Sequence, residues 1–74
     1  MTLEEFVRSV KNEEPIFGKG YRDGDRIVEG WYAVDPTDLE AITTEALKMP
    51  GVLPPGTEWD DALRIIDEAF APLP

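Results

Sequence analysis

The sequence predicts a small α+β domain in which three helices pack around an antiparallel β-hairpin or small sheet, in the order α-β-β-α-α. Apolar residues repeat with the period of a helix near the N-terminus and again in the second half of the chain. Between these segments, residues 16–35 change to the alternating pattern of β-strands, with Asp23-Gly24 as a strong hairpin signal. The length of 74 residues allows one compact domain, residues 1–74.

The first helix is expected over residues 2–13. Thr2 and Glu5 have the spacing of a capping box, in which each side chain accepts a hydrogen bond from the backbone amide of the other residue. Pro15 disfavours the helical conformation of the residue before it and therefore ends the helix. The residues of one apolar stripe are expected to face the core: Leu3, Phe6, Val7 and Val10.

Asp23-Gly24 predicts a type I′ turn that pairs residues 18–22 with residues 25–29. The second strand continues to Val34, and Gly30 within it indicates a bulge or close packing against a helix. Two strands alone are marginally stable, and the sequence leaves open whether Ile16-Phe17 or Val52-Leu53 adds a third. The alternation of side chains along the second strand gives it two faces. One face carries Val28, Tyr32 and Val34, and the other carries Ile27, Glu29, Trp31 and Ala33.

Two further helices are expected after the strands. The second begins with Asp35 as N-cap and Pro36 at its first position, and its inner stripe comprises Leu39, Ile42, Thr43, Ala46 and Leu47. Pro50-Gly51 ends it, and Thr57 is expected to cap the third helix. The core stripe of that helix comprises Trp59, Ala62, Leu63, Ile66 and Phe70.

The composition excludes several kinds of site. The chain has no Cys and no His, which rules out disulfides, thiolate zinc sites and Ser–His nucleophiles. Asp23-Gly24-Asp25 suggests a calcium loop, but the twelfth position, where an EF-hand needs Glu, is Val34. The adjacent carboxylates Asp60-Asp61 are better explained as a solvated helix face than as an acid–base pair. No catalytic residue, metal or cofactor is therefore expected.

The net charge of −9, from sixteen Asp and Glu against seven Lys and Arg, disfavours direct binding to nucleic acid or to an anionic membrane. No apolar run approaches the ~20 residues that span a bilayer, and the acidic N-terminus is unlike a signal peptide. We therefore expect a cytoplasmic monomer.

Most of the negative charge falls in the second half of the chain. Residues 1–34 have a net charge of −2 and residues 35–74 a net charge of −7. This half provides either a solubility surface or a face that binds a basic protein surface. Trp31 is either an exposed interface anchor or part of the core. The candidate partner-binding residues are Asp38, Glu45, Asp60, Asp61, Asp67, Glu68, Glu29 and Trp31.

A compact, strongly acidic chain with carboxylates on its helix faces, such as Asp60-Asp61 and Asp67-Glu68, resembles the phage-encoded anti-CRISPR proteins that act on type I systems. One type I-C member of that class has three helices around an antiparallel sheet. The resemblance is one of organisation and covers the whole chain. It implies a non-catalytic inhibitor that occupies a positively charged nucleic-acid channel of a type I effector (Cascade) subunit in the host cytoplasm.

The rival hypothesis is a small interaction or assembly protein, such as an antitoxin, an immunity factor or a virion assembly component. Its contact would use the hydrophobic hairpin face around Trp31 and Ile27 rather than the carboxylates. Binding that weakens as salt rises would support the acidic inhibitor. Binding that tolerates salt but is lost in Trp31→Ala would support the rival hypothesis.

Overall fold

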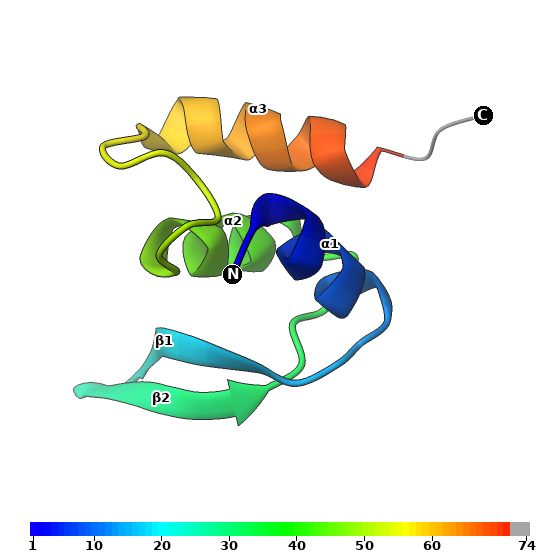
Figure 1. Cartoon of the computed structure of the whole chain (residues 1–74). Helices are drawn as coiled ribbons and strands as arrows, with labels where there is room; N and C mark the ends of the chain where they lie inside the picture. Colours follow the sequence, from blue (N-terminus) through cyan, green and yellow to red (C-terminus); the bar gives the residue numbers. More distant parts are fainter. Residues whose placement is uncertain (72–74) are drawn as a thin grey trace.

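Three helices and one β-hairpin make up residues 1–71, the part of the chain that the computed structural model describes, apart from the side chains of residues 19–23 and 27. The predicted α+β class and the order α-β-β-α-α are confirmed. The elements are α1 (Leu3–Lys11), β1 (Ile16–Asp23), β2 (Arg26–Tyr32), α2 (Leu39–Lys48) and α3 (Trp59–Phe70). They form three layers, with the hairpin below, α1 and α2 side by side in the middle, and α3 above (Figure 1).

The core lies where these layers meet. It draws at least one buried side chain from each helix, from β1 and from the segments that follow β2 and α2: Phe6, Val10, Ile16, Val34, Ile42, Ala46, Val52 and Ile66. Val52, which the sequence left open as part of a third strand, is buried in the connection between α2 and α3. Ile16-Phe17 instead begins β1, so the sheet of the described residues has two strands.

The first helix has the predicted N-terminus. The capping box is present, with Thr2 Oγ1 accepting from the Glu5 amide at 3.2 Å and Glu5 Oε1 accepting from the Thr2 amide at 3.1 Å. The hydrogen bond from the Thr2 amide, together with one from the Thr2 side chain, stabilises the ionised carboxylate and lowers the pKa of Glu5. At the other end, Glu13 has a φ of 54°, and α1 ends at Lys11, two residues before the predicted end.

The hairpin turn differs by one residue from the prediction. Asp23 pairs with Arg26, so the two-residue loop is Gly24-Asp25 and not Asp23-Gly24. Gly24 has a φ of 64°, and glycine at the first loop position is typical of a type II′ turn rather than the expected type I′ turn. The bulge expected at Gly30 is present beside it, with the extra residue in β1 between Gly18 and Tyr21.

The helices α2 and α3 both start later than predicted, because the residues expected to cap them, Asp35 and Thr57, belong to turns instead. Asp35 begins a β-turn with Pro36 at its second position, and Asp38 instead caps α2 by accepting from the Ala41 amide at 3.1 Å. The second turn is Pro54-Pro55-Gly56-Thr57, in which Gly56 has a φ of 79°. Thr57 donates its hydroxyl to the Pro54 carbonyl, and the N-cap of α3 is Glu58, without a side-chain capping bond.

Candidate binding surfaces

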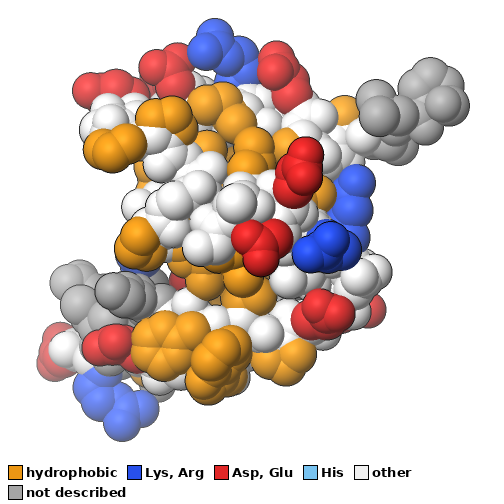
Figure 2. Space-filling view, in the orientation of Figure 1, with side chains coloured by type: hydrophobic (Ala, Val, Ile, Leu, Met, Phe, Trp, Pro, Cys, Tyr) orange, Lys and Arg blue, Asp and Glu red, His pale blue; other side chains and the backbone are white. Residues whose placement is uncertain are grey.

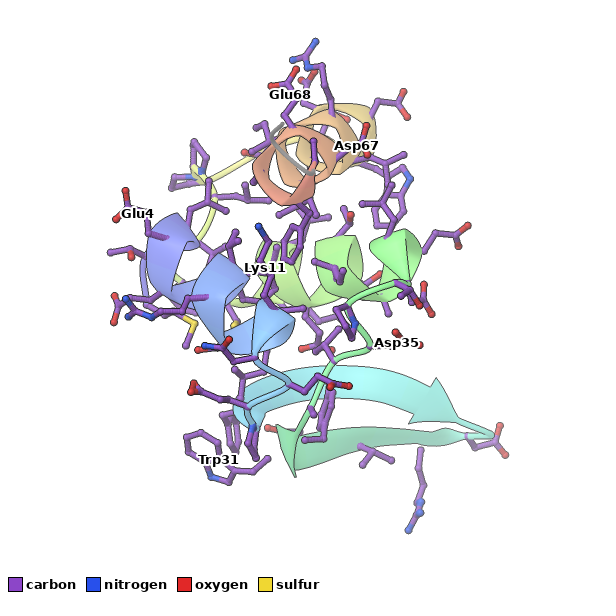
Figure 3. All side chains as sticks on the ribbon, turned by 90° about the vertical axis from the view of Figure 1, so that its right-hand side faces the viewer. Glu4, Lys11, Trp31, Asp35, Asp67 and Glu68 are labelled. Carbon is purple, nitrogen blue, oxygen red and sulfur yellow. The ribbon has the colours of Figure 1, made fainter. Side chains whose placement is uncertain are left out.

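The outer side of α3 carries the acidic face that the sequence predicted. Ala62 and Ile66 are fully buried and fix the rotation of the helix. The four candidate carboxylates of α3 are consequently exposed, and we call them the α3 acidic face: Asp60, Asp61, Asp67 and Glu68. Figure 2 shows acidic side chains on this upper side of the molecule, and Figure 3 shows Asp67 and Glu68 projecting away from the other layers.

One cation interrupts the α3 acidic face. Arg64 lies between the carboxylates on the same side of the helix, and its Nη2 is 3.1 Å from Asp61 Oδ1. Both side chains are largely exposed, so this ion pair contributes little to stability. Arg64 nevertheless reduces the local charge. The other three carboxylates of the α3 acidic face are exposed: Asp60, Asp67 and Glu68.

Trp31 is on the opposite side of the molecule from α3 (Figure 3). Its side chain is 72% exposed. Of the two possibilities that the sequence left open, an exposed residue or a core residue, Trp31 is therefore the exposed one. Phe17 pairs with it across the hairpin, with an edge-to-face arrangement and 5.7 Å between ring centroids. We call these two rings the hairpin aromatic pair. A shallow cavity of about 250 Å³ borders the pair, and its other lining residues are Met1, Lys48, Met49 and Pro50.

The remaining surface candidates are separated from the α3 acidic face along the chain. Asp38 is exposed, but its carboxylate is engaged in capping α2. Glu29 is exposed on the same face of β2 as Trp31, as the alternation predicted. Ile27, named with Trp31 in the rival hypothesis, has its side chain outside the described residues.

Glu45 is a correction to the predicted surface. It was expected to face outwards with the other carboxylates of the second helix, yet it is only 3% exposed. Since α2 lies between the hairpin and α3, it buries a wider arc than a helix covered on one side. Tyr32, on the inner face of β2, donates its hydroxyl to Glu45 Oε1. In the described part of the chain, the second oxygen, Oε2, is buried and has no hydrogen-bond partner.

Sequence reasoning missed the contact between Tyr32 and Glu45, although one signal for it was present. A tyrosine on the core face of a strand needs an acceptor for its hydroxyl, and a nearby helix must supply it. Gly18 completes the arrangement by leaving room for the ring, because a Cβ at residue 18 would lie 2.1 Å from the Tyr32 hydroxyl oxygen.

Trp59 is a second correction. It was assigned to the core stripe of the third helix, but its side chain is 41% exposed. It occupies the first position of α3. The helical period places Trp59 on the same side of α3 as the buried Ala62 and Ile66, yet its own side chain is not buried.

Asp35 is a further carboxylate with local hydrogen bonds. Asp35 accepts from the Thr37 amide at 2.9 Å and from the Thr37 hydroxyl at 2.7 Å, and these bonds lower the pKa of the exposed carboxyl. Among the described residues, no three carboxylates gather in a cluster that could hold a metal ion. Nor does any helix within that range have the length and apolar character needed to cross a membrane.

Comparisons with known proteins found no protein-family model, no curated protein and no solved structure that matches the chain. The α3 acidic face, the hairpin aromatic pair and the buried Glu45 are therefore the features from which its function can be inferred.

Proposed function

We propose that this protein is a non-catalytic inhibitor that blocks the positively charged nucleic-acid-binding surface of a partner through the α3 acidic face. The observation that carries the proposal is the exposure of four carboxylates on one side of a helix held by two fully buried residues. Asp60 and Asp67 are seven residues apart, as are Asp61 and Glu68, which corresponds to about 10 Å along the helix axis.

The mechanism is competition for cations. A groove that binds nucleic acid presents Lys and Arg to the phosphates, and binding releases the counterions of the phosphates. Carboxylates on a stable helix can contact the same cations and keep the nucleic acid from reaching them. The net charge of −7 in residues 35–74 also increases the rate at which a basic partner associates.

The partner implied by the resemblance is a subunit of a type I CRISPR effector, with type I-C as the narrower expectation and a phage anti-CRISPR as the class of inhibitor. The test is a gel-shift competition between this protein and target DNA for a purified type I-C effector. Wild-type protein should displace the DNA, and displacement should weaken as salt rises.

Two matched variants locate the contact. Replacing the α3 acidic face by lysine, with Asp60→Lys, Asp61→Lys, Asp67→Lys and Glu68→Lys, should abolish the competition. The control makes the same charge change at four exposed carboxylates elsewhere, with Glu4→Lys, Glu13→Lys, Glu14→Lys and Asp25→Lys, and should retain most of it. Full competition by the α3 variant would contradict the proposal.

The second candidate function is that of a small interaction or assembly protein, such as an antitoxin, an immunity factor or a virion assembly component. The 72% exposure of Trp31 beside Phe17 favours it, because exposed aromatic rings often anchor protein interfaces. The same assay separates the candidates. Binding that tolerates salt but is lost in Trp31→Ala would support a contact through the hairpin aromatic pair. If the contact is the α3 acidic face, the Trp31→Ala variant should still displace the DNA.

A further inference from the structure

A groove of about 420 Å³ lies between α1 and the end of α3, and we call it the α1–α3 groove. Most of its lining is apolar, with Leu3 and Val7 on α1 and Ala69 on α3, and all three residues are half-buried. The α3 acidic face and the hairpin aromatic pair are formed by other residues. The size and the apolar lining of the groove are typical of sites that bind small molecules.

The polar groups of the α1–α3 groove gather towards one end of α1. Arg8 and Lys11 are three residues apart and therefore neighbours on one side of the helix, and Asn12 follows at the C-cap. Figure 3 shows Lys11 reaching from α1 towards α3, where its Nζ is 5.8 Å from the centre of the Phe70 ring. Glu4 lines the groove nearer the N-terminus of α1. Among the described lining residues, two cations thus stand against one carboxylate, in a chain whose net charge is −9.

We propose that the α1–α3 groove binds an aliphatic carboxylate of medium chain length, with the carboxylate held by Arg8 and Lys11 and the chain lying along the apolar lining. A guanidinium donates two parallel hydrogen bonds to a carboxylate, and an ammonium group can donate a third. Leu3 and Lys11 are eight residues apart, which corresponds to about 12 Å along the helix axis. An extended chain can therefore run from the two cations over the apolar residues.

Charge complementarity favours this ligand over a neutral or a cationic one. A neutral apolar ligand would leave both cations of the groove without a counter-charge, and a cationic ligand would be repelled by them. The net charge of −9 repels anions at long range. At about 0.1 M salt, however, the Debye length is about 10 Å, so the cations of the groove act on the ligand more strongly than carboxylates on distant surfaces.

This inference goes beyond the proposed function, because it concerns a small ligand and other side chains. The competition assay with DNA does not report on the α1–α3 groove. Each proposal can therefore fail without the other.

The test is a titration followed by NMR on the full chain, with octanoate as the probe and every probe kept below the concentration at which it forms micelles. Acetate has the carboxylate without the chain, and octyl glucoside has the chain without the charge. Octanoate should shift the amide signals of Val7, Lys11 and Ala69, and should bind at least ten-fold more tightly than either control. Equal binding of octyl glucoside, or no shift with octanoate, would overturn the proposal.

Matched variants attribute the binding to the two cations. Arg8→Gln combined with Lys11→Gln should weaken octanoate binding about ten-fold or more, because the charge-assisted hydrogen bonds are lost. The control, Arg26→Gln combined with Arg64→Gln, removes the same charge elsewhere and should change the affinity less than two-fold. All four side chains are exposed, so both variants should keep the fold, which their amide spectra verify. An equal loss in both variants would show that net charge, and not the groove, determines binding.

A third variant tests the apolar part of the site. Ala69→Phe places a ring in the α1–α3 groove without changing a charge and should abolish octanoate binding, whereas unchanged affinity would place the ligand elsewhere. The other possible occupant is a segment of a protein partner. If a helical peptide with leucine on one side and glutamate beside it binds the groove while octanoate does not, the proposal of an aliphatic carboxylate is wrong.

Discussion

Tyr32 occupies the space that a side chain at residue 18 would need, and it reaches Glu45 on α2 through that space. Gly18 and Gly30 face each other across the hairpin, so this stretch of the inner face carries no side chain of its own. Single residues thus decide how the hairpin meets the helices. The two main predictions that were wrong also concern single residues. Glu45 is buried and Trp59 is exposed, and each outcome depends on what lies over that one side chain.

Gly18→Ala should lower the free energy of unfolding by about 1–3 kcal/mol, because the new Cβ overlaps the Tyr32 ring. The substitution would otherwise be expected to help a strand, since alanine loses less backbone entropy than glycine on folding. Urea denaturation measures the change. In a Tyr32→Leu background the cost should shrink, and an equal cost in both backgrounds would show that the ring is not its cause.

At the scale of the element, local sequence signals predicted the type of every helix and strand but only some of their ends. The capping box of α1 depends on residues three apart and was predicted correctly. The starts of α2 and α3 were wrong, because Asp35 and Thr57 satisfy nearby turns instead of a helix. Several residues near a helix start can cap it, and the turn that forms before it decides which one does.

Glu13→Gly should raise the free energy of unfolding by about 0.5–1 kcal/mol. Glu13 has a positive φ, and the amides of Glu13 and Glu14 donate to the Val10 and Ser9 carbonyls, which is the pattern of a Schellman motif. Glycine adopts this conformation without the steric cost that glutamate incurs. The matched control is Glu14→Gly, which removes the same charge and should leave stability unchanged or lower in urea denaturation; a stabilising Glu14→Gly would contradict this explanation.

At the scale of the whole molecule, the layered arrangement separates the α3 acidic face from the hairpin aromatic pair (Figures 1 and 3). One small flat surface of a partner cannot cover both.

The excess of carboxylates makes the charges of the folded chain repel one another at neutral pH, since the net charge is −9.

Raising NaCl from about 20 mM to about 500 mM at pH 7 should stabilise the protein by an amount on the order of 1 kcal/mol, because salt screens this repulsion. Urea denaturation at each salt concentration measures it. The control is the same series near the sequence pI of about 4.2, where the net charge is close to zero and the gain should largely vanish. A loss of stability with salt at pH 7 would indicate that attractive ion pairs outweigh the repulsion.

The sequence by itself determined the features that depend on neighbours along the chain. Periodicity and turn chemistry were enough for the order of elements, the α1 capping box, the hairpin, the shared face of Trp31 and Glu29 on β2, and the outward side of α3. Each of these is set by interactions within a few residues, which the sequence displays directly.

Only the tertiary structure decided which sides of the elements are covered. It placed α2 between two layers, which buried Glu45 beneath Tyr32, and it left Trp59 exposed at the start of α3. It also kept Ile16-Phe17 and Val52 out of a third strand. The physical reason is that burial and strand pairing depend on residues far apart in the chain, and a helical or alternating pattern shows which side of an element is apolar but not how many of its sides are covered.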